Sequence, residues 1–325
     1  MSLKRKEVKP APLRTGDTVG IIAPASPIER DQFEAGCAAL RALGYELFYL
    51  ESIFEHQRYF SGPLRRRVDE FNQMWARPDI KAIVCARGGY GCNYLLPEID
   101  CDLIAANPKV FVGYSDVTSL LTYITDATGL VTFHGPMVAK DFALPEGVDV
   151  ANWGQVFSGE STQMVFSAGS EVVPLIRGYG RGRLYGGCLS MLAASMGTPY
   201  EVQTDGTILF VEDIGTKPYQ VDRMLMQLKL GGKLDGVRGI LFGQMVDCEP
   251  GPGSDYTIRD VVASIAGDLS IPVAYGFRSG HVSGGGNTTI PIGIEATLQV
   301  QDEEVRLAWQ SAVAVEGARR AWERV

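Results

Sequence analysis

The first 140 residues alternate short β-branched runs with longer stretches of helical periodicity, and this alternation constrains the fold more than any other feature. Strands are expected over Thr18–Ala23, Tyr45–Leu50, Lys81–Cys85, Val110–Gly113 and Leu130–His134. Helices are expected over Glu29–Leu43, Leu64–Trp75 and Asp116–Thr125. Repeated strand–helix–strand units build parallel sheets with right-handed crossovers. Ligands of such sheets bind beyond the carboxyl ends of the strands.

The second half resumes the pattern after a turn-rich stretch in which the periodicity weakens. Strands are expected over Gly206–Val211, Arg238–Phe242 and Pro272–Gly276, and helices over Gln220–Lys229 and Ile258–Ala266. Further on, Thr288–Ile294 and Ala296–Val300 are expected to pair as a hairpin, and Gln310–Val325 to form a peripheral helix or tail. The chain is therefore predicted to be an α/β protein with an N-terminal domain over 1–145, an interdomain linker over 146–182 and a C-terminal domain over 183–325.

Charge and length exclude several classes of protein. A chain of 325 residues is long enough for two domains. Its net charge of −8 disfavours non-specific binding to nucleic acid. The basic start is followed by no apolar run typical of a secretory signal, and no stretch of 18 apolar residues predicts a membrane helix. The protein is expected to bind neither membrane nor nucleic acid.

Cysteine and histidine are too scattered to predict a metal site. The six cysteines form no C-x-x-C pair, and the three histidines lie far apart. Isolated cysteines in a chain of this length are typical of reduced core residues in a cytoplasmic protein. We expect no metal and no cofactor.

Ser115 is the first candidate for chemistry. It follows the expected strand Val110–Gly113 directly and precedes a helix. A sharp strand-to-helix turn exposes a serine hydroxyl and leaves backbone N–H groups free at the helix start. The usual G-x-S-x-G has a second glycine where this chain has Val117. Because capping serines are common, the pattern alone favours a helix cap over a nucleophile by about two to one.

A glycine-rich turn, Arg87 to Gly91, follows the third expected strand. Three glycines in four positions allow the backbone to approach a ligand closely. The turn lacks the spacing and the lysine of a phosphate-binding loop. An oxyanion-binding loop, whose N–H groups meet a developing negative oxygen, is one interpretation, and a plain tight turn is the other.

Two residues of the second half could complete a serine hydrolase. Glu212 ends an expected buried strand, and His281 lies in the glycine-rich loop 280–286. The chain order serine, acid, histidine is that of α/β-hydrolases. His134 follows an apolar strand and is expected to be packed, whereas His56 lies in a polar stretch. His281 is thus the favoured base, although a solvated strand end and a structural loop histidine remain alternatives.

Together these segments resemble the LD-carboxypeptidase family of serine peptidases, which includes muramoyltetrapeptide carboxypeptidases and microcin C immunity peptidases. The resemblance spans about residues 17–308, and the matching segments occur in the order found in the family. These segments are 22–26, 86–91, 113–118, 186–190, 212–213 with 222–223, and 280–281. Cys188 departs from the family, because many relatives have asparagine there. The short region between the expected domains favours the muropeptide branch.

The resemblance implies a fold, a set of roles and a substrate. The fold would be an N-terminal parallel-sheet (Rossmann- or flavodoxin-like) domain with a smaller β-rich α/β C-terminal domain. Ser115 would be the nucleophile, His281 the general base and acid, and Glu212 the carboxylate that orients His281. The backbone N–H groups of Gly89 and Asp116 would form the oxyanion hole. The substrate would be a small muropeptide, a murein tetrapeptide that loses its terminal D-alanine during peptidoglycan recycling, and the protein would be a homodimer.

Several alternatives stay open. The chain could hydrolyse peptide–nucleotide conjugates, as the immunity peptidases do, or bind a sugar or nucleotide without catalysis. A cysteine hydrolase that uses Cys85 or Cys92 has little support, since Cys85 closes an apolar strand. Arg87 and Arg183 are candidates to bind the terminal carboxylate of a substrate, and the sequence does not decide between them.

Overall fold

The computed structural model describes residues 5–315, which divide into two compact units. Unit 1 contains the chain up to Ser161, together with Gly284–Gly293 and the residues from Ser311 onward, and unit 2 contains Thr162–Ser283 and Ile294–Gln310. The chain therefore passes between the units four times. These boundaries differ from the expected ones, because the stretch 146–182 contains a helix and two strands, and a third strand begins in it.

Unit 1 is an α/β structure with one six-stranded sheet. Its strands are β1 (Thr18–Ile22), β2 (Glu46–Phe48), β3 (Ile80–Cys85), β4 (Val110–Gly113), β5 (Thr132–His134) and β12 (Ile290–Ile292). Its α-helices are α1 (Arg30–Ala42), α2 (Leu64–Ala76), α3 (Cys101–Ala106), α4 (Thr118–Thr128) and α5 (Val150–Ser158). Short 3-10 turns are η1 (Glu51–Phe54), η2 (Cys92–Tyr94) and η3 (Ser115–Val117).

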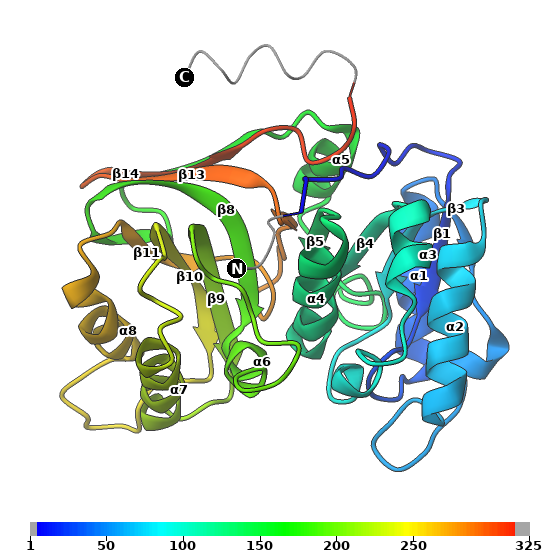
Figure 1. Cartoon of the computed structure of the whole chain (residues 1–325), viewed down its shortest axis with the longest axis horizontal. Helices are drawn as coiled ribbons and strands as arrows, with labels where there is room; N and C mark the ends of the chain where they lie inside the picture. The colour runs from blue at the N-terminus through cyan, green and yellow to red at the C-terminus, as the bar shows by residue number, and fades with distance from the viewer. Residues whose placement is uncertain (1–4, 316–325) are drawn as a thin grey trace. The chain divides into compact units, whose positions relative to one another are not determined.

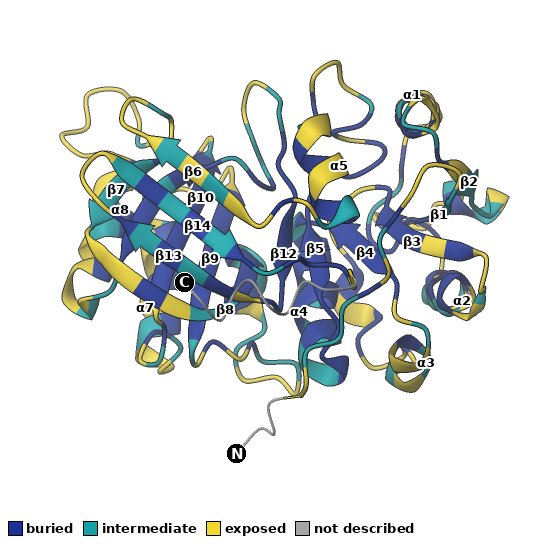
Figure 2. Cartoon of the chain, turned by 90° about the horizontal axis from the view of Figure 1, so that it is seen from above, coloured by how far each residue is buried: buried dark blue, intermediate teal, exposed yellow. Residues whose placement is uncertain are grey.

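The first sheet has the strand order β12-β5-β4-β3-β1-β2, in which β1 to β5 are parallel. The parallel strands thus follow the flavodoxin-like order 2-1-3-4-5, which confirms the predicted fold class. Figure 2 shows α1 and α5 on one face of this sheet and α2, α3 and α4 on the other. The strand interiors are buried, as both faces of a parallel sheet require.

Unit 2 is built on an eight-stranded mixed sheet. Its strands are β6 (Gln163–Ser167), β7 (Val173–Ile176), β8 (Gly178–Cys188), β9 (Thr207–Ile214), β10 (Gly239–Val246), β11 (Val273–Phe277), β13 (Glu295–Val300) and β14 (Glu304–Trp309). Its helices are α6 (Leu189–Ala194), α7 (Pro218–Leu230) and α8 (Ile258–Ala266), with a 3-10 turn η4 (Gly267–Leu269). In Figure 1 the three α-helices lie on one side of the sheet.

The strand order of the second sheet is β6-β14-β13-β8-β9-β10-β11-β7. Strands β8 to β11 are parallel, and the strands added at both edges are antiparallel. The parallel centre brings the carboxyl ends of β9 and β11 to the same edge of the sheet. The predicted acid Glu212 lies near the carboxyl end of β9, and the predicted His281 follows β11.

Two expectations for the C-terminal region need correction. The predicted hairpin of 288–294 with 296–300 is wrong, because β12 pairs with β5 of unit 1, whereas β13 pairs with β8 and β14 of unit 2. Gly293 lies between the two strands with a φ of 98°, so the chain turns from one sheet to the other there. Of the predicted tail, residues 310–315 form no helix, and 316–325 lie outside the described residues.

Candidate active site

Ser115 lies at a strained strand-to-helix turn at the carboxyl end of β4. Its φ is 63°, in the left-handed region that non-glycine residues rarely adopt. A Cβ on Gly113 would come 2.7 Å from Val117, so the glycine lets the turn close tightly against that valine. Ser115 makes no capping hydrogen bond to α4 or to the short turn before it. The structure therefore gives no support to the cap interpretation, and the strained turn has the geometry of a nucleophile elbow.

The glycine-rich turn 87–91 packs directly against Ser115. A Cβ on Gly88 would lie 2.8 Å from the Cβ and 3.1 Å from the Oγ of Ser115, so only glycine fits. Gly89 has a φ of 107°, and a Cβ there would meet the side chain of Ser26. The Ser26 Oγ accepts a hydrogen bond of 3.1 Å from the Tyr90 N–H. The glycines thus bring backbone N–H groups beside the serine hydroxyl.

Two backbone donors near Ser115 have no protein acceptor. Within residues 5–315, neither the Gly89 N–H nor the Asp116 N–H donates a hydrogen bond to another protein group. Asp116 is buried, where N–H groups are normally paired, whereas Gly89 is exposed to solvent. Two unused donors beside a reactive hydroxyl have the character of an anion-binding site.

The Asp116 carboxylate ties the serine turn to the glycine-rich turn. Its Oδ2 accepts a 2.8 Å hydrogen bond from the Cys92 N–H. Burial raises the pKa of this carboxyl group, and the hydrogen bond from Cys92 opposes that effect. The residue after the nucleophile candidate therefore anchors the loop that carries Gly89.

In unit 2 the structure brings Glu212 and His281 together. Glu212 lies on β9 and is completely buried, and the His281 side chain is 10% exposed. The Nδ1 atom of His281 lies 2.7 Å from the Glu212 Oε2, and the same oxygen accepts the His281 backbone N–H at 3.1 Å. This double contact fixes the ring orientation and leaves Nε2 as the nitrogen that can exchange a proton.

Side chains that the sequence analysis did not single out brace the histidine loop. Arg278 donates to the Ser283 carbonyl at 2.9 Å and to Glu171 at 2.6 Å. Gln244 accepts from the Ser283 N–H at 2.9 Å. These contacts hold both ends of the loop 278–283. No local pattern marks the contacts with Gln244 and Glu171, because these partners are 39 and 107 residues apart in the chain.

The two candidate arginines and the other two histidines lie in the following surroundings. Arg87 donates to the Pro27 carbonyl at 3.1 Å, and Arg183 donates to the Gln203 carbonyl at 3.2 Å. His134 is fully buried within the first sheet, as expected of a packed residue, and His56 is exposed. The two arginines belong to different units, so their local contacts do not favour one of them as the carboxylate-binding residue.

The cysteines do not have the environment of a nucleophile. Cys85 and Cys92 are fully buried, and burial raises the pKa of both thiols well above the ordinary value. A thiol without thiolate character is unreactive. In the described part of the chain, no three histidine, cysteine or acidic side chains are grouped so that they could hold a metal ion.

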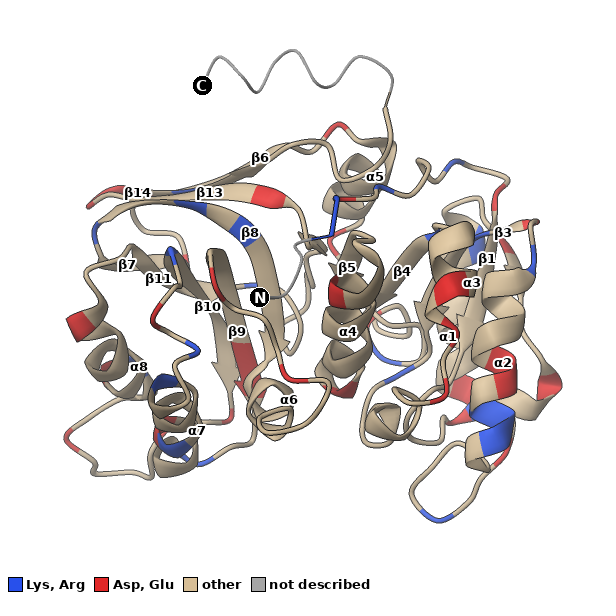
Figure 3. Ribbon diagram, in the orientation of Figure 1, with Lys and Arg blue, Asp and Glu red and all other residues tan. Residues whose placement is uncertain are grey.

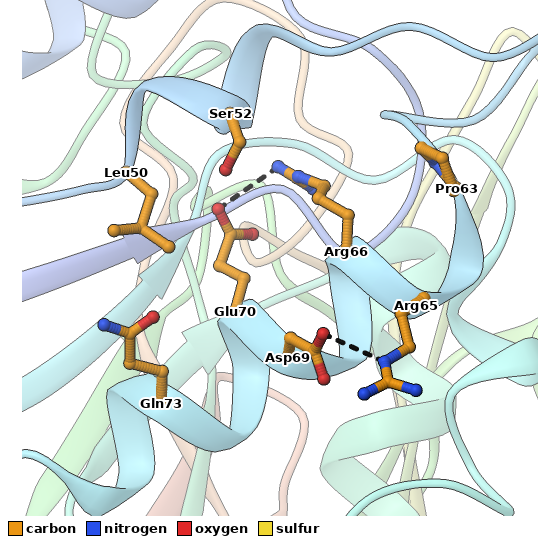
Figure 4. A pocket seen from close by; sticks show the side chains of 8 residues that line it. All are labelled: Leu50, Ser52, Pro63, Arg65, Arg66, Asp69, Glu70 and Gln73. Carbon is orange, nitrogen blue, oxygen red and sulfur yellow. Dashed lines mark hydrogen bonds and ion pairs between the residues drawn. The ribbon is translucent and has the colours of Figure 1, made fainter.

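A separate pocket of about 380 Å³ lies on unit 1, beside α2 and η1. None of the predicted site residues lines it. Figure 4 shows Arg66 and Glu70 facing each other at this pocket, with 3.1 Å between Arg66 Nη2 and Glu70 Oε1. Figure 3 shows that α2 carries charges of both signs. Burial raises the pKa of Glu70 to about 7, and its Oε2 accepts the N–H of Ala23 at 3.1 Å.

Comparison with known families identifies the class of protein. Residues 19–135 match the LD-carboxypeptidase N-terminal domain, and residues 181–298 match the LD-carboxypeptidase C-terminal domain. The chain belongs to the LD-carboxypeptidase family of serine peptidases and is a hydrolase of carboxypeptidase type. The resemblance predicted from the ordered motifs is confirmed.

Individual relatives cover nearly the whole chain. The probable murein peptide carboxypeptidase of Bacillus subtilis is 37% identical over 299 residues, which cover 91% of this chain and 92% of the relative. The solved structure of the microcin C7 self-immunity protein MccF in its wild-type apo state matches with a TM-score of 0.85 and 28% identity, over 94% of this chain and 100% of that one. The muramoyltetrapeptide carboxypeptidase of Oxalobacter formigenes matches with a TM-score of 0.80 and 29% identity, over 90% and 98%.

No helix within residues 5–315 combines the length and the apolar character that crossing a bilayer requires.

Proposed function

We propose that this protein is a serine LD-carboxypeptidase that releases the terminal D-alanine from murein tetrapeptides. The single observation that carries the proposal is the strained Ser115 turn, packed against a glycine loop with unused N–H donors. The identity of 37% to a relative named as a murein peptide carboxypeptidase supports the choice of substrate. The scissile bond would join the L-centre of the diamino acid at position three to D-alanine.

The proposed reaction begins with proton transfer from Ser115 to His281. A serine hydroxyl is a weak nucleophile, so the Nε2 of His281 would take its proton as Oγ attacks the carbonyl carbon. Glu212 would hold the imidazole in the tautomer with a proton on Nδ1 and stabilise the imidazolium that forms. The 2.7 Å contact between Glu212 and Nδ1 fits this role.

The negative oxygen of the tetrahedral intermediate would be bound by the N–H groups of Gly89 and Asp116. Loss of one such donor typically lowers turnover by about 10²–10³. The imidazolium would then protonate the amine of D-alanine, which leaves, and water activated by His281 would hydrolyse the acyl-enzyme. Serine and histidine are thereby regenerated, and a tripeptide remains.

The proposal includes a setting for the enzyme. A role in peptidoglycan recycling would place it in the cytoplasm, where its six free cysteines would stay reduced. As the family resemblance implies, it would be a homodimer. Light scattering coupled to size-exclusion chromatography tests this, with a mass near twice 35.3 kDa expected.

A second candidate function is hydrolysis of peptide–nucleotide conjugates. The TM-score of 0.85 to MccF favours it, and one structure of that protein is a complex with glutamyl sulfamoyl guanosine. The two functions are separated by comparing kcat/KM for a murein tetrapeptide with kcat/KM for a glutamyl sulfamoyl nucleoside. We expect the tetrapeptide to be preferred at least about tenfold, a difference of about 1.4 kcal/mol in transition-state binding.

A further inference from the structure

Arg67 is a buried cation directly beneath the glycine-rich turn. It lies on α2 and is 2% exposed. Its Nη1 donates to the Pro24 carbonyl at 2.8 Å and to the Gly91 carbonyl at 2.9 Å. The guanidinium also lies 4.7 Å from the centre of the Phe60 ring. One nitrogen thus links the segment after β1 to the turn after β3.

The turn is shaped to receive this side chain. Gly91 has a φ of 137°, and a Cβ at that position would lie 2.8 Å from Arg67 Nη1 and 2.9 Å from the Phe60 ring. Glycine is therefore needed for the arginine to reach the Gly91 carbonyl. A buried cation is costly unless its donors are used, so this contact is a built feature of the fold.

Arg67 and Asp116 hold the same short segment from opposite sides. Arg67 binds the carbonyl of Gly91, whereas the Asp116 carboxylate accepts the N–H of Cys92, which belongs to the same peptide group. Asp116 is itself the residue after Ser115. The position of the glycine-rich turn is thereby fixed relative to Asp116, whose backbone N–H is the second candidate oxyanion donor.

The other end of the turn is held through the segment that Arg67 also binds. Two residues after Pro24, the Ser26 N–H donates to the Gly88 carbonyl at 3.3 Å, and Ser26 Oγ accepts the Tyr90 N–H. Gly89 lies between these two contacts. Arg67 is therefore hydrogen-bonded both to the segment after β1 and to the glycine-rich turn. The spacing of these two segments sets the direction of the Gly89 N–H.

We propose that Arg67 is a positioning residue that sets the direction of the Gly89 N–H for oxyanion binding. This inference rests on the proposed function. It concerns a residue that touches neither substrate nor Ser115 and acts through the glycine-rich turn. Its removal would displace a donor needed mainly in the transition state, and would leave ground-state binding of the peptide nearly unchanged.

The test compares Arg67→Met with wild type on a murein tetrapeptide. Methionine keeps much of the apolar length and removes both hydrogen bonds. We expect kcat to fall about 10–100-fold, with KM changed less than about threefold. The inhibition constant of a murein tripeptide whose terminal carboxyl is replaced by a boronic acid, which forms a tetrahedral adduct with a serine, is expected to rise by the same factor as kcat falls.

Two further variants complete the experiment. Arg65→Met removes an exposed arginine of the same helix and is expected to behave as wild type. Arg67→Lys keeps the charge with a shorter reach and is expected to lose about three- to tenfold in kcat. Thermal denaturation shows whether Arg67→Met folds. If it does not, Arg67→Lys takes its place in the comparison.

A purely structural arginine would lower the folded fraction without changing kcat or boronate affinity per folded molecule. The inference is overturned if folded Arg67→Met keeps kcat within threefold of wild type, or if its loss lies in KM with unchanged boronate affinity. Wild-type kcat and boronate affinity in Arg67→Lys would also overturn it. Failure of the proposed function would be seen separately: wild type would release no D-alanine, or Ser115→Ala would still release it.

Discussion

The Nδ1 atom of His281 lies 2.7 Å from the Oε2 atom of Glu212, and the backbone N–H of His281 donates to the same oxygen. The carboxylate is fully buried on a central strand, while the imidazole lies in a loop reached 69 residues later. The ring therefore cannot rotate without losing its Nδ1 hydrogen bond, and the backbone hydrogen bond holds the loop against the same buried oxygen. Such a constraint suits a proton-transfer group whose tautomer must be fixed.

Replacing Glu212 by glutamine tests this constraint. The amide can still accept a hydrogen bond but cannot stabilise an imidazolium, so kcat on the tetrapeptide is expected to fall about 10²–10⁴-fold. KM is expected to change little. Glu295→Gln, which alters a half-exposed carboxylate of the same unit, is the control and should keep wild-type kcat. A kcat within threefold of wild type in Glu212→Gln would refute the role of Glu212.

The strained backbone at Ser115 predicts an unusual order of stability. At a φ of 63° a Cβ is unfavourable by about 1–2 kcal/mol, so Ser115→Gly should be more stable than Ser115→Ala by about 1 kcal/mol. In the middle of α1 the order reverses, and Ala38→Gly should lose about 1 kcal/mol. Urea denaturation measures both differences. Equal stability of the two Ser115 variants would show that the turn is not strained.

Buried Glu70 predicts a stability that falls as pH rises. Its pKa in the folded protein is about 7, above the ordinary 4.5, because burial outweighs the attraction of Arg66. Between pH 4.5 and 7 the folded protein therefore keeps a proton on Glu70 that the unfolded chain has lost. The stability that this proton contributes is fully present below pH 4.5 and is lost as the pH rises through 7. For this one group the loss between pH 5 and 7.5 is about 2 kcal/mol.

Glu70→Gln should remove that part of the pH dependence, since its amide still accepts the N–H of Ala23. Asp69→Asn on the same helix, where the carboxylate is exposed, should leave it in place. Asp141, whose pKa burial raises to about 6, adds a dependence of the same sign in both variants. Urea denaturation at the two pH values gives the comparison. An unchanged slope in Glu70→Gln would show that Glu70 is ionised throughout.

The buried thiols predict resistance to alkylation. Cys101 is the half-buried cysteine, whereas Cys85 and Cys92 are fully buried with raised thiol pKa values. Iodoacetamide at pH 7.5 should label Cys101 first and leave hydrolysis unaffected. Peptide mapping by mass spectrometry identifies the labelled sites. Inactivation in proportion to labelling of Cys85 or Cys92 would revive the cysteine-hydrolase alternative.

Local patterns were sufficient to predict the parallel core of unit 1. The expected strand Val110–Gly113 matches β4, and the expected helix Ile258–Ala266 of unit 2 matches α8. Each of these segments carries its own periodicity and end signals. The segment 288–294, which contains β12, was also expected to be a strand, but its expected partner was wrong, because β12 pairs with β5, more than 150 residues earlier. Pairing with a distant strand leaves no local signal.

The candidate site divides in the same way. Ser115 and Glu212 end strands that periodicity predicts, and elimination among three histidines favoured His281. Arg67 was missed, although its position four residues before Phe71 and eight before Trp75 places it on the buried face of α2. Polarity outweighed spacing, since arginine is rarely buried. A charged residue at a core-facing position is therefore the signal that could have identified it.

The most direct test of the central claim is mass spectrometry of a purified murein tetrapeptide incubated with wild type and with Ser115→Ala. The account predicts that wild type converts the tetrapeptide to the tripeptide and free D-alanine, while folded Ser115→Ala leaves it intact. An unchanged tetrapeptide with folded wild type, or the same loss of alanine with Ser115→Ala, would contradict it.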